Sequence, residues 1–145
     1  MERPGILIEI KTGNEQVDLS RRQADIAIRL TMPNEPQLVA QLAGKMRFGL
    51  YTVPAYGAFF GMPKTLENLF PHRIIDHSTL GASQLQPWHG IVLNHPHVAY
   101  RTNPSVCHQW AIQAGYGIGL FPNYTTKIFP SLIPVPVELG IEAPI

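Results

Sequence analysis

The sequence predicts an α/β fold with parallel strands, and two observations support this. Residues 6–10 and 26–30 are apolar, β-branched runs typical of buried strands, and the polar stretch 16–25 between them is compatible with a short helix. Strand, helix and strand in this order imply parallel strands joined by a right-handed crossover. The chain also passes four times from a predicted strand into a helix start through proline or small polar residues.

Composition indicates one domain without a nucleic-acid or membrane surface of its own. The chain has 145 residues, 45% of them hydrophobic and 14% charged, and a net charge of +1 with no basic run longer than two residues. This balance excludes the electrostatic footprint of a DNA-binding surface. The single cysteine, Cys107, excludes an intrachain disulfide. Because signal-peptide and membrane-spanning patterns are also missing, we expect a cytoplasmic location.

In the first half of the chain, we expect residues 38–43 to be extended and residues 46–52 to form a strand. A helix over 55–60 follows Pro54 and ends at Gly61. A short helix over 65–70 and a brief strand over 73–76 complete this half.

In the second half, the segment 77–97 is rich in turn-forming residues, with a predicted strand at 91–93. A strand over 97–101 precedes a helix with Asn103 as N-cap, Pro104 as first residue and Gly115 at its end. A strand over 117–121 and a short helix to about Ile128 follow. Residues 132–137 carry two prolines, so we expect a sheet edge or a crossing segment.

The strand-to-helix junctions are the candidates for ligand binding. In open α/β sheets, ligands bind outside the carboxyl ends of the strands, where helix N-termini favour carboxylate or phosphate. The alternative is ordinary helix capping, which is the better explanation of each junction taken singly, whereas the junctions together favour a crevice. The junctions are Thr12-Gly13-Asn14, Thr52-Val53-Pro54, Thr102-Asn103-Pro104 and Phe121-Pro122-Asn123.

Other motifs do not predict chemistry. His95 and His97 have His89 nearby, but no carboxylate or cysteine stands at ligand spacing, so we expect no metal site. Cys107 and His108 are adjacent and would point about 100° apart on a helix, which excludes a nucleophile–base pair. The serines lack a nucleophile-elbow context. We therefore expect neither an enzyme nor a cofactor.

A set of short motifs follows along the chain: Ala24-Asp25-Ile26-Ala27-Ile28-Arg29, Val53-Pro54-Ala55-Tyr56, Gly61-x-Pro63, Leu66-x-x-Leu69, Asn103, and the run from Ala114 to Pro122. In this order and spacing, the motifs resemble the effector-binding domain of LysR-type transcriptional regulators. The resemblance implies a two-lobed α/β fold of the periplasmic-binding-protein type (type II), with a small effector between the lobes. It also implies a homo-oligomer formed through this domain and DNA binding by a separate winged helix-turn-helix domain.

Against this family pattern, residues 1–43 are expected to form a partial first lobe, 44–133 the second lobe, and 134–145 the return to the first lobe. The winged helix-turn-helix domain and its linker helix are not in the sequence. The chain opens on what would be the second strand and stops short of the family's final strand and helix. We therefore expect an incomplete first lobe.

The resemblance and the junctions together predict a crevice that binds a small organic anion or another polar metabolite. The rival function is a solute-binding protein of the same fold used in transport. Arg29 has its own alternative, a solvated charge at the end of a strand. The expected ligand-binding residues are Thr12, Gly13, Asn14 and Arg29 from the first lobe, and Thr52, Thr102, Asn103 and Pro122 from the second.

Overall fold

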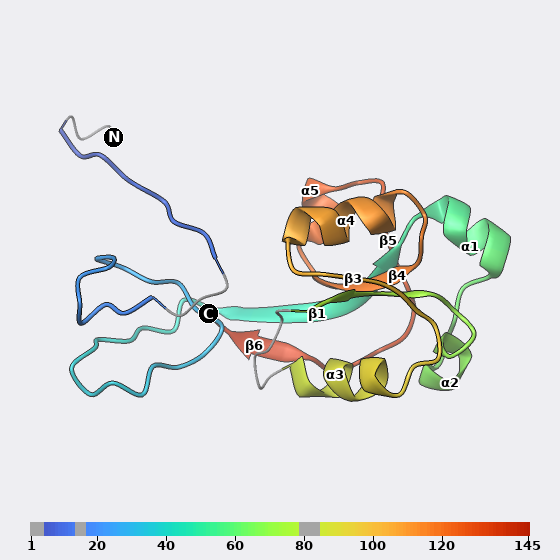
Figure 1. The fold of residues 1–145 in the computed structure, drawn as a ribbon, viewed down its shortest axis with the longest axis horizontal. Coiled ribbons are helices and arrows are strands. Elements are labelled where there is room, and N and C mark those ends of the chain that lie inside the picture. Colours follow the sequence, from blue (N-terminus) through green and yellow to red (C-terminus); the bar gives the residue numbers. More distant parts are fainter. Residues whose placement is uncertain (1–4, 14–16, 79–84) are drawn as a thin grey trace.

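The computed structural model describes residues 5–13, 17–78 and 85–145, and it contains a mixed sheet with helices on both faces (Figure 1). The helices α4 and α5 lie on one side of the sheet and α3 lies on the other. The strands are β1 (Lys45–Thr52), β2 (Ile74–His77), β3 (Val98–Thr102), β4 (Ile118–Pro122), β5 (Ile133–Pro134) and β6 (Glu142–Pro144). The helices are α1 (Pro54–Phe60), α2 (Leu66–Leu69), α3 (Gln86–Leu93), α4 (Ser105–Gln113) and α5 (Thr125–Ile128).

The strand order β3-β2-β4-β1-β5 determines which chain segments meet at each end of the sheet. β2 runs parallel to β3 and to β4, whereas β1 runs antiparallel to β4, with Phe48 opposite Pro122 and Tyr51 opposite Gly119. The carboxyl ends of β2, β3 and β4 therefore lie at one end of the sheet, beside the beginning of β1. The carboxyl end of β1 lies at the opposite end.

Strand β1 is long enough to pair with different partners along its length. Its first residues pair with β6, and its last residues pair with β4 and β5. Glu142 on β6 bridges Lys45 at 2.9 Å and Arg47 at 3.2 Å across the first pairing. The segment that precedes β1 extends away beyond this end of the sheet (Figure 1).

The core lies between the sheet and its helices, and close backbone approaches allow it to form. A methyl group added to Gly119 on β4 would stand 2.2 Å from Cδ1 of Ile112 on α4, so glycine is required there. Gly115 ends the α4 region with a φ of 75°, a conformation that glycine adopts without strain. The core residues of largest volume and lowest exposure are Trp88, Leu50, Leu69, Ile74, Ile75, Leu85, Ile112, Ile118 and Leu120.

The two strands expected near the N-terminus, over 6–10 and 26–30, are wrong. Both segments lack regular secondary structure, and most of their apolar side chains are exposed, with Ile26 at 83% and Ile28 at 84%, whereas Leu30 is partly buried against the core. The expected helix is likewise replaced by turns over its described part, 17–25. A strand is stabilised by neighbouring strands and by burial of one face, and within the described residues these segments have neither.

Two expectations in the second half are also corrected. Residues 91–93 form the last turn of α3 rather than a strand, because Trp88 and Val92, four residues apart, bury one helix face. Helix α4 begins at Ser105, one residue later than expected, with Pro104 at the N-cap position and no side-chain capping bond. The other elements expected between residues 46 and 128 are confirmed, with ends that differ by a residue or a few.

Candidate functional site

Three strand ends, two of which belong to predicted junctions, meet at the end of the sheet where the parallel strands finish. His77 ends β2, Thr102 ends β3 and Pro122 ends β4. The backbone N–H of Ser78 donates to the carbonyl of Thr102 at 2.8 Å, which holds the ends of β2 and β3 side by side. Because β1 begins at this same end, the site faces the segment that precedes β1 (Figure 1).

Helix α4 supplies the polar groups of this end. It starts three residues after Thr102, and the first N–H groups of any α-helix have no acceptor within the helix. Ser105, at the first helical position, is exposed, and its Oγ lies 3.0 Å from Nε2 of His77. His77 itself is 3% exposed, so a buried ring makes a direct contact with an exposed hydroxyl.

An ion pair between the buried carboxylate of Asp76 and the half-exposed guanidinium of Arg101 joins two strands next to the site. Asp76 on β2 is 6% exposed; its Oδ2 accepts from Nε of Arg101 on β3 at 2.8 Å, and its Oδ1 accepts from the indole N–H of Trp88 at 3.3 Å. These partners satisfy a carboxylate that burial alone would penalise. Asp76 therefore links β2, β3 and α3, and each of its two oxygens already accepts a hydrogen bond.

The histidines of this region are held neutral. Burial lowers the pKa of His108 from 6.5 to about 4, and its ring donates from Nε2 to the carbonyl of Ile75 at 3.2 Å. Burial also lowers the pKa of His77, whose ring lies edge-on to that of His108 with the ring centroids 5.6 Å apart. At neutral pH, these groups contribute hydrogen bonds rather than charge.

The structure brings Thr102, Asn103 and Pro122 together at this end of the sheet, but it does not bring Thr52 to them. Thr52 lies at the opposite end, fully buried, and its hydroxyl donates to the carbonyl of Gly117 at 2.9 Å. That hydrogen bond joins the end of β1 to the residue that precedes β4. Asn14 lies outside the described residues.

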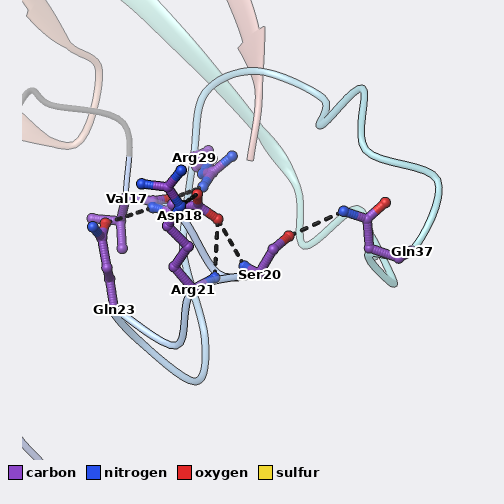
Figure 2. A network of polar contacts seen from close by, with 7 residues as sticks. All are labelled: Val17, Asp18, Ser20, Arg21, Gln23, Arg29 and Gln37. Carbon is purple, nitrogen blue, oxygen red and sulfur yellow. Dashed lines mark hydrogen bonds and ion pairs between the residues drawn. The ribbon is translucent and has the colours of Figure 1, made fainter.

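The first-lobe candidates lie in the segment before β1. Thr12 and Gly13 are exposed there. Arg29 donates to the carbonyl of Val17 within a network of polar contacts that also joins Asp18 to its neighbours (Figure 2). Its Nη1 is buried without a hydrogen-bond partner among the described residues. Arg29 also lines a hollow of about 500 Å³ that extends to Pro144 and Ile145.

Sequence reasoning missed His77 and Ser105. The criterion that selected Thr102, a polar residue at the end of a predicted strand, applies equally to His77, which follows the strand predicted over 73–76. Ser105 follows the proline of its junction, so its hydroxyl was available to the same argument. Finding these two residues requires the exact position at which each element begins or ends.

Among residues 5–13, 17–78 and 85–145, no group of three histidine, cysteine or acidic side chains is arranged to hold a metal ion. No helix within those ranges is long and apolar enough to cross a membrane.

Parallel strands that end together beside a helix start define the ligand-binding class of open α/β domains. The sequence matches the family described as LysR substrate binding domain over residues 1–141, and the chain belongs to this family. This is a family of regulator domains rather than of enzymes, and the match favours the regulator over the transport alternative.

Known relatives agree with this assignment. An HTH-type transcriptional regulator of Xanthomonas campestris pv. campestris (strain 8004) is 32% identical over 72 residues, which are 50% of this chain and 21% of that protein. The regulatory domain of AphB from Vibrio vulnificus is similar with a TM-score of 0.57 and 20% identity, over 77% of this chain and 57% of that one. For the CrgA regulatory domain from Neisseria meningitidis, the TM-score is 0.59 and the identity 18%, over 80% and 60%.

These structural matches confirm the predicted fold class, the two-lobed fold of the periplasmic-binding-protein type that LysR regulatory domains have. The chain spans about three fifths of the two regulatory domains and about one fifth of the curated relative.

Proposed function

We propose that this chain is the effector-sensing part of a LysR-type transcriptional regulator and binds a small metabolite where β2, β3 and β4 end. The observation that carries the proposal is the convergence of three strand ends and the start of α4 at one end of the sheet, facing residues 5–13 and 17–44. Membership of a substrate-binding family supports a ligand there. The proposed boundaries are 1–43 and 134–145 for the first lobe and 44–133 for the second.

The chemistry of this end favours an organic anion. A carboxylate would accept from the first N–H groups of α4 and from the hydroxyls of Thr102 and Ser105, and the helix dipole favours negative charge at this position. Asn103 adds an amide, and Pro122 shapes the floor. From the first lobe, the ligand's other side would meet Thr12, Gly13 and Nη1 of Arg29, a nitrogen without a hydrogen-bond partner among the described residues.

In the whole regulator, we infer that the bound effector changes how a homo-oligomer holds DNA through a separate winged helix-turn-helix domain in the cytoplasm. β1 and β6 would transmit the effect of the bound effector, because both lie between the site and the segment before β1. A ligand that draws the two sides of the crevice together would displace these two strands first.

Calorimetric titration tests the site. The chain is titrated with a panel of small carboxylic acids and matched neutral metabolites, and the best binder is then measured on two variants. Thr102→Val should weaken binding about fivefold or more, since it removes a hydroxyl partner at nearly constant shape, worth about 1 kcal/mol.

The matched control is Thr52→Val, the same change at the far end of the sheet, which should leave the affinity unchanged. Equal affinities of the wild type and the Thr102 variant would show that the ligand binds elsewhere. A panel in which no compound binds at millimolar concentration would contradict the proposed function.

A further inference from the structure

His95 is a buried histidine whose two ring nitrogens join two separate parts of the chain. The ring is 7% exposed; its Nε2 lies 3.1 Å from the carbonyl oxygen of Leu69 at the end of α2, and its Nδ1 lies 3.1 Å from the backbone nitrogen of His97, just before β3. A carbonyl can only accept and a backbone N–H can only donate. The proton of the neutral ring is therefore on Nε2, and Nδ1 is the acceptor.

A neutral ring fits this position, and a charged ring does not. A second proton on His95 would be bound at Nδ1, where it would face the N–H of His97, so two donors would oppose each other in place of the hydrogen bond. Burial adds the cost of taking a charge out of water. The ring of Phe70 stacks on the imidazole with the centroids 5.5 Å apart, so a displacement of His95 also disturbs the residue that follows α2.

We propose that His95 is a pH-sensitive contact, which holds α2 against the start of β3 while its ring is neutral and releases α2 when the ring takes up a proton. α2 has only four residues, too few to be stable without outside contacts. Its last carbonyl, that of Leu69, accepts from His95 and from the backbone N–H of His72. The contact lies where β2 and β3 begin, at the end of the sheet opposite the proposed effector site, so it does not rest on that site.

The titratable groups nearest to His95 are other histidines. Burial lowers the pKa of His95 and of His72, and like charges lower both pKa values further, because His97 acts on His95 and His95 acts on His72. The ring of His97 lies edge-on to that of His95 with the centroids 6.4 Å apart. Next to His72, the Tyr56 hydroxyl of α1 lies 3.2 Å from Nδ1 and accepts from the backbone N–H of Arg73 at 3.0 Å.

In the described part of the chain, no carboxylate is paired with either His95 or His72. α2 carries the exposed Glu67 and α3 carries His89, and neither forms a hydrogen bond or an ion pair with His95 among the described residues. Because burial lowers the pKa of His95 below its ordinary value of 6.5, the released form binds more protons as pH falls. The contact is therefore closed at pH 7.5 and opens progressively below pH 6.5.

Two NMR measurements on the intact chain test the proposal. At pH 7.5, the ring nitrogen shifts of His95 should report a protonated Nε2 and an unprotonated Nδ1. Hydrogen-exchange protection factors, which correct for the intrinsic effect of pH, should fall at least threefold from pH 7.5 to 5.5 for the N–H groups of His97 and His72. A released pKa of 6.5 limits this loss to about tenfold. The N–H of Val135, bonded to the carbonyl of Leu50 elsewhere in the sheet, is the internal reference.

Variants assign the loss to His95. His95→Gln takes up no proton in this range, so its protection factors should change less than twofold between the two pH values. The matched control is His89→Gln, which removes a histidine without contact to His95 and should retain the full loss. Circular dichroism at both pH values confirms that each protein is folded. A proton on Nδ1 at pH 7.5, a wild-type loss below threefold, or a loss of twofold or more in His95→Gln would overturn the proposal.

Discussion

At the scale of single residues, His108 shows how the fold tolerates a polar group in its core. The ring is 2% exposed between α4 and the sheet, packs against Phe121 with ring centroids 4.7 Å apart, and donates to the carbonyl of Ile75. That hydrogen bond pairs the single N–H of the neutral ring. A proton on the second nitrogen would place an uncompensated charge in an apolar layer.

We predict a pH dependence of stability from this residue. Its pKa is lowered to about 4 in the folded chain, below the unfolded value of 6.5, so the unfolded chain binds more protons between these values. Stability is complete above pH 6.5 and falls as pH drops toward 4, by roughly 3 kcal/mol for a shift of this size.

Urea unfolding from pH 7.5 to 4.5 measures this dependence, and His108→Gln should flatten it. The residual slope of that variant comes from His72, His77 and His95, whose pKa values are also lowered by burial. A wild-type slope that the substitution leaves intact would refute the assignment to His108.

At the scale of elements, the contact between α4 and β4 depends on a glycine, Gly119, which has no side chain. A Cβ at Gly119 would lie 2.2 Å from Cδ1 of Ile112 and 2.9 Å from Nε2 of His108, and both of those side chains are buried. Neither can move without disturbing the core. The distance between helix and strand at this point is thus set by glycine.

Gly119→Ala should destabilise the chain by about 1–3 kcal/mol, the usual cost of overpacking. Thermal and urea unfolding measure the loss. The matched control is Gly90→Ala on α3, where an added methyl group meets nothing within 4 Å; it should stabilise by about 0.5–1 kcal/mol because alanine favours the helix. Equal effects of the two substitutions would show that the α4–β4 contact is looser than the structure indicates.

At the scale of the whole molecule, the chain combines a packed α/β unit with a segment whose apolar side chains are exposed. Within residues 5–43, these include Leu7 at 94%, Ile26 at 83%, Ile28 at 84% and Val39 at 100% exposure. Isolated exposed apolar residues are common on protein surfaces, but a run of them promotes association. The β-branched composition adds a tendency to pair as strands between chains.

We therefore predict concentration-dependent self-association through this segment, measured by sedimentation velocity over a micromolar range. The double variant Ile26→Lys and Ile28→Lys should shift the distribution toward the monomer, because each lysine replaces exposed apolar surface with charge. Leu93→Lys, which changes an equally exposed residue at the end of α3, is the control and should have little effect. A wild-type chain that stays monomeric across the range would contradict the prediction.

How much of the fold could be predicted depends on how local its signals are. Pro54 and Gly61 bracket α1 and Gly115 ends the α4 region, because proline and glycine act through their own backbone angles. The prediction of a strand over 91–93 is wrong because a short apolar run fits a buried strand and a buried helix turn equally well. Residues 26–30 have strand composition, yet composition without a pairing partner does not make a strand.

The sequence by itself determined the α/β class, most elements between residues 46 and 128, and the order of motifs that indicated the family. Only the tertiary structure decided which junctions share an end of the sheet. Thr52 and Thr102 stand in similar local contexts, but β1 runs antiparallel to β4 and β3 runs parallel to β2, so the two threonines lie at opposite ends. Strand direction is set by long-range pairing, and no local pattern encodes it. For the same reason, the contact between His77 and Ser105, 28 residues apart, exists only in the folded chain.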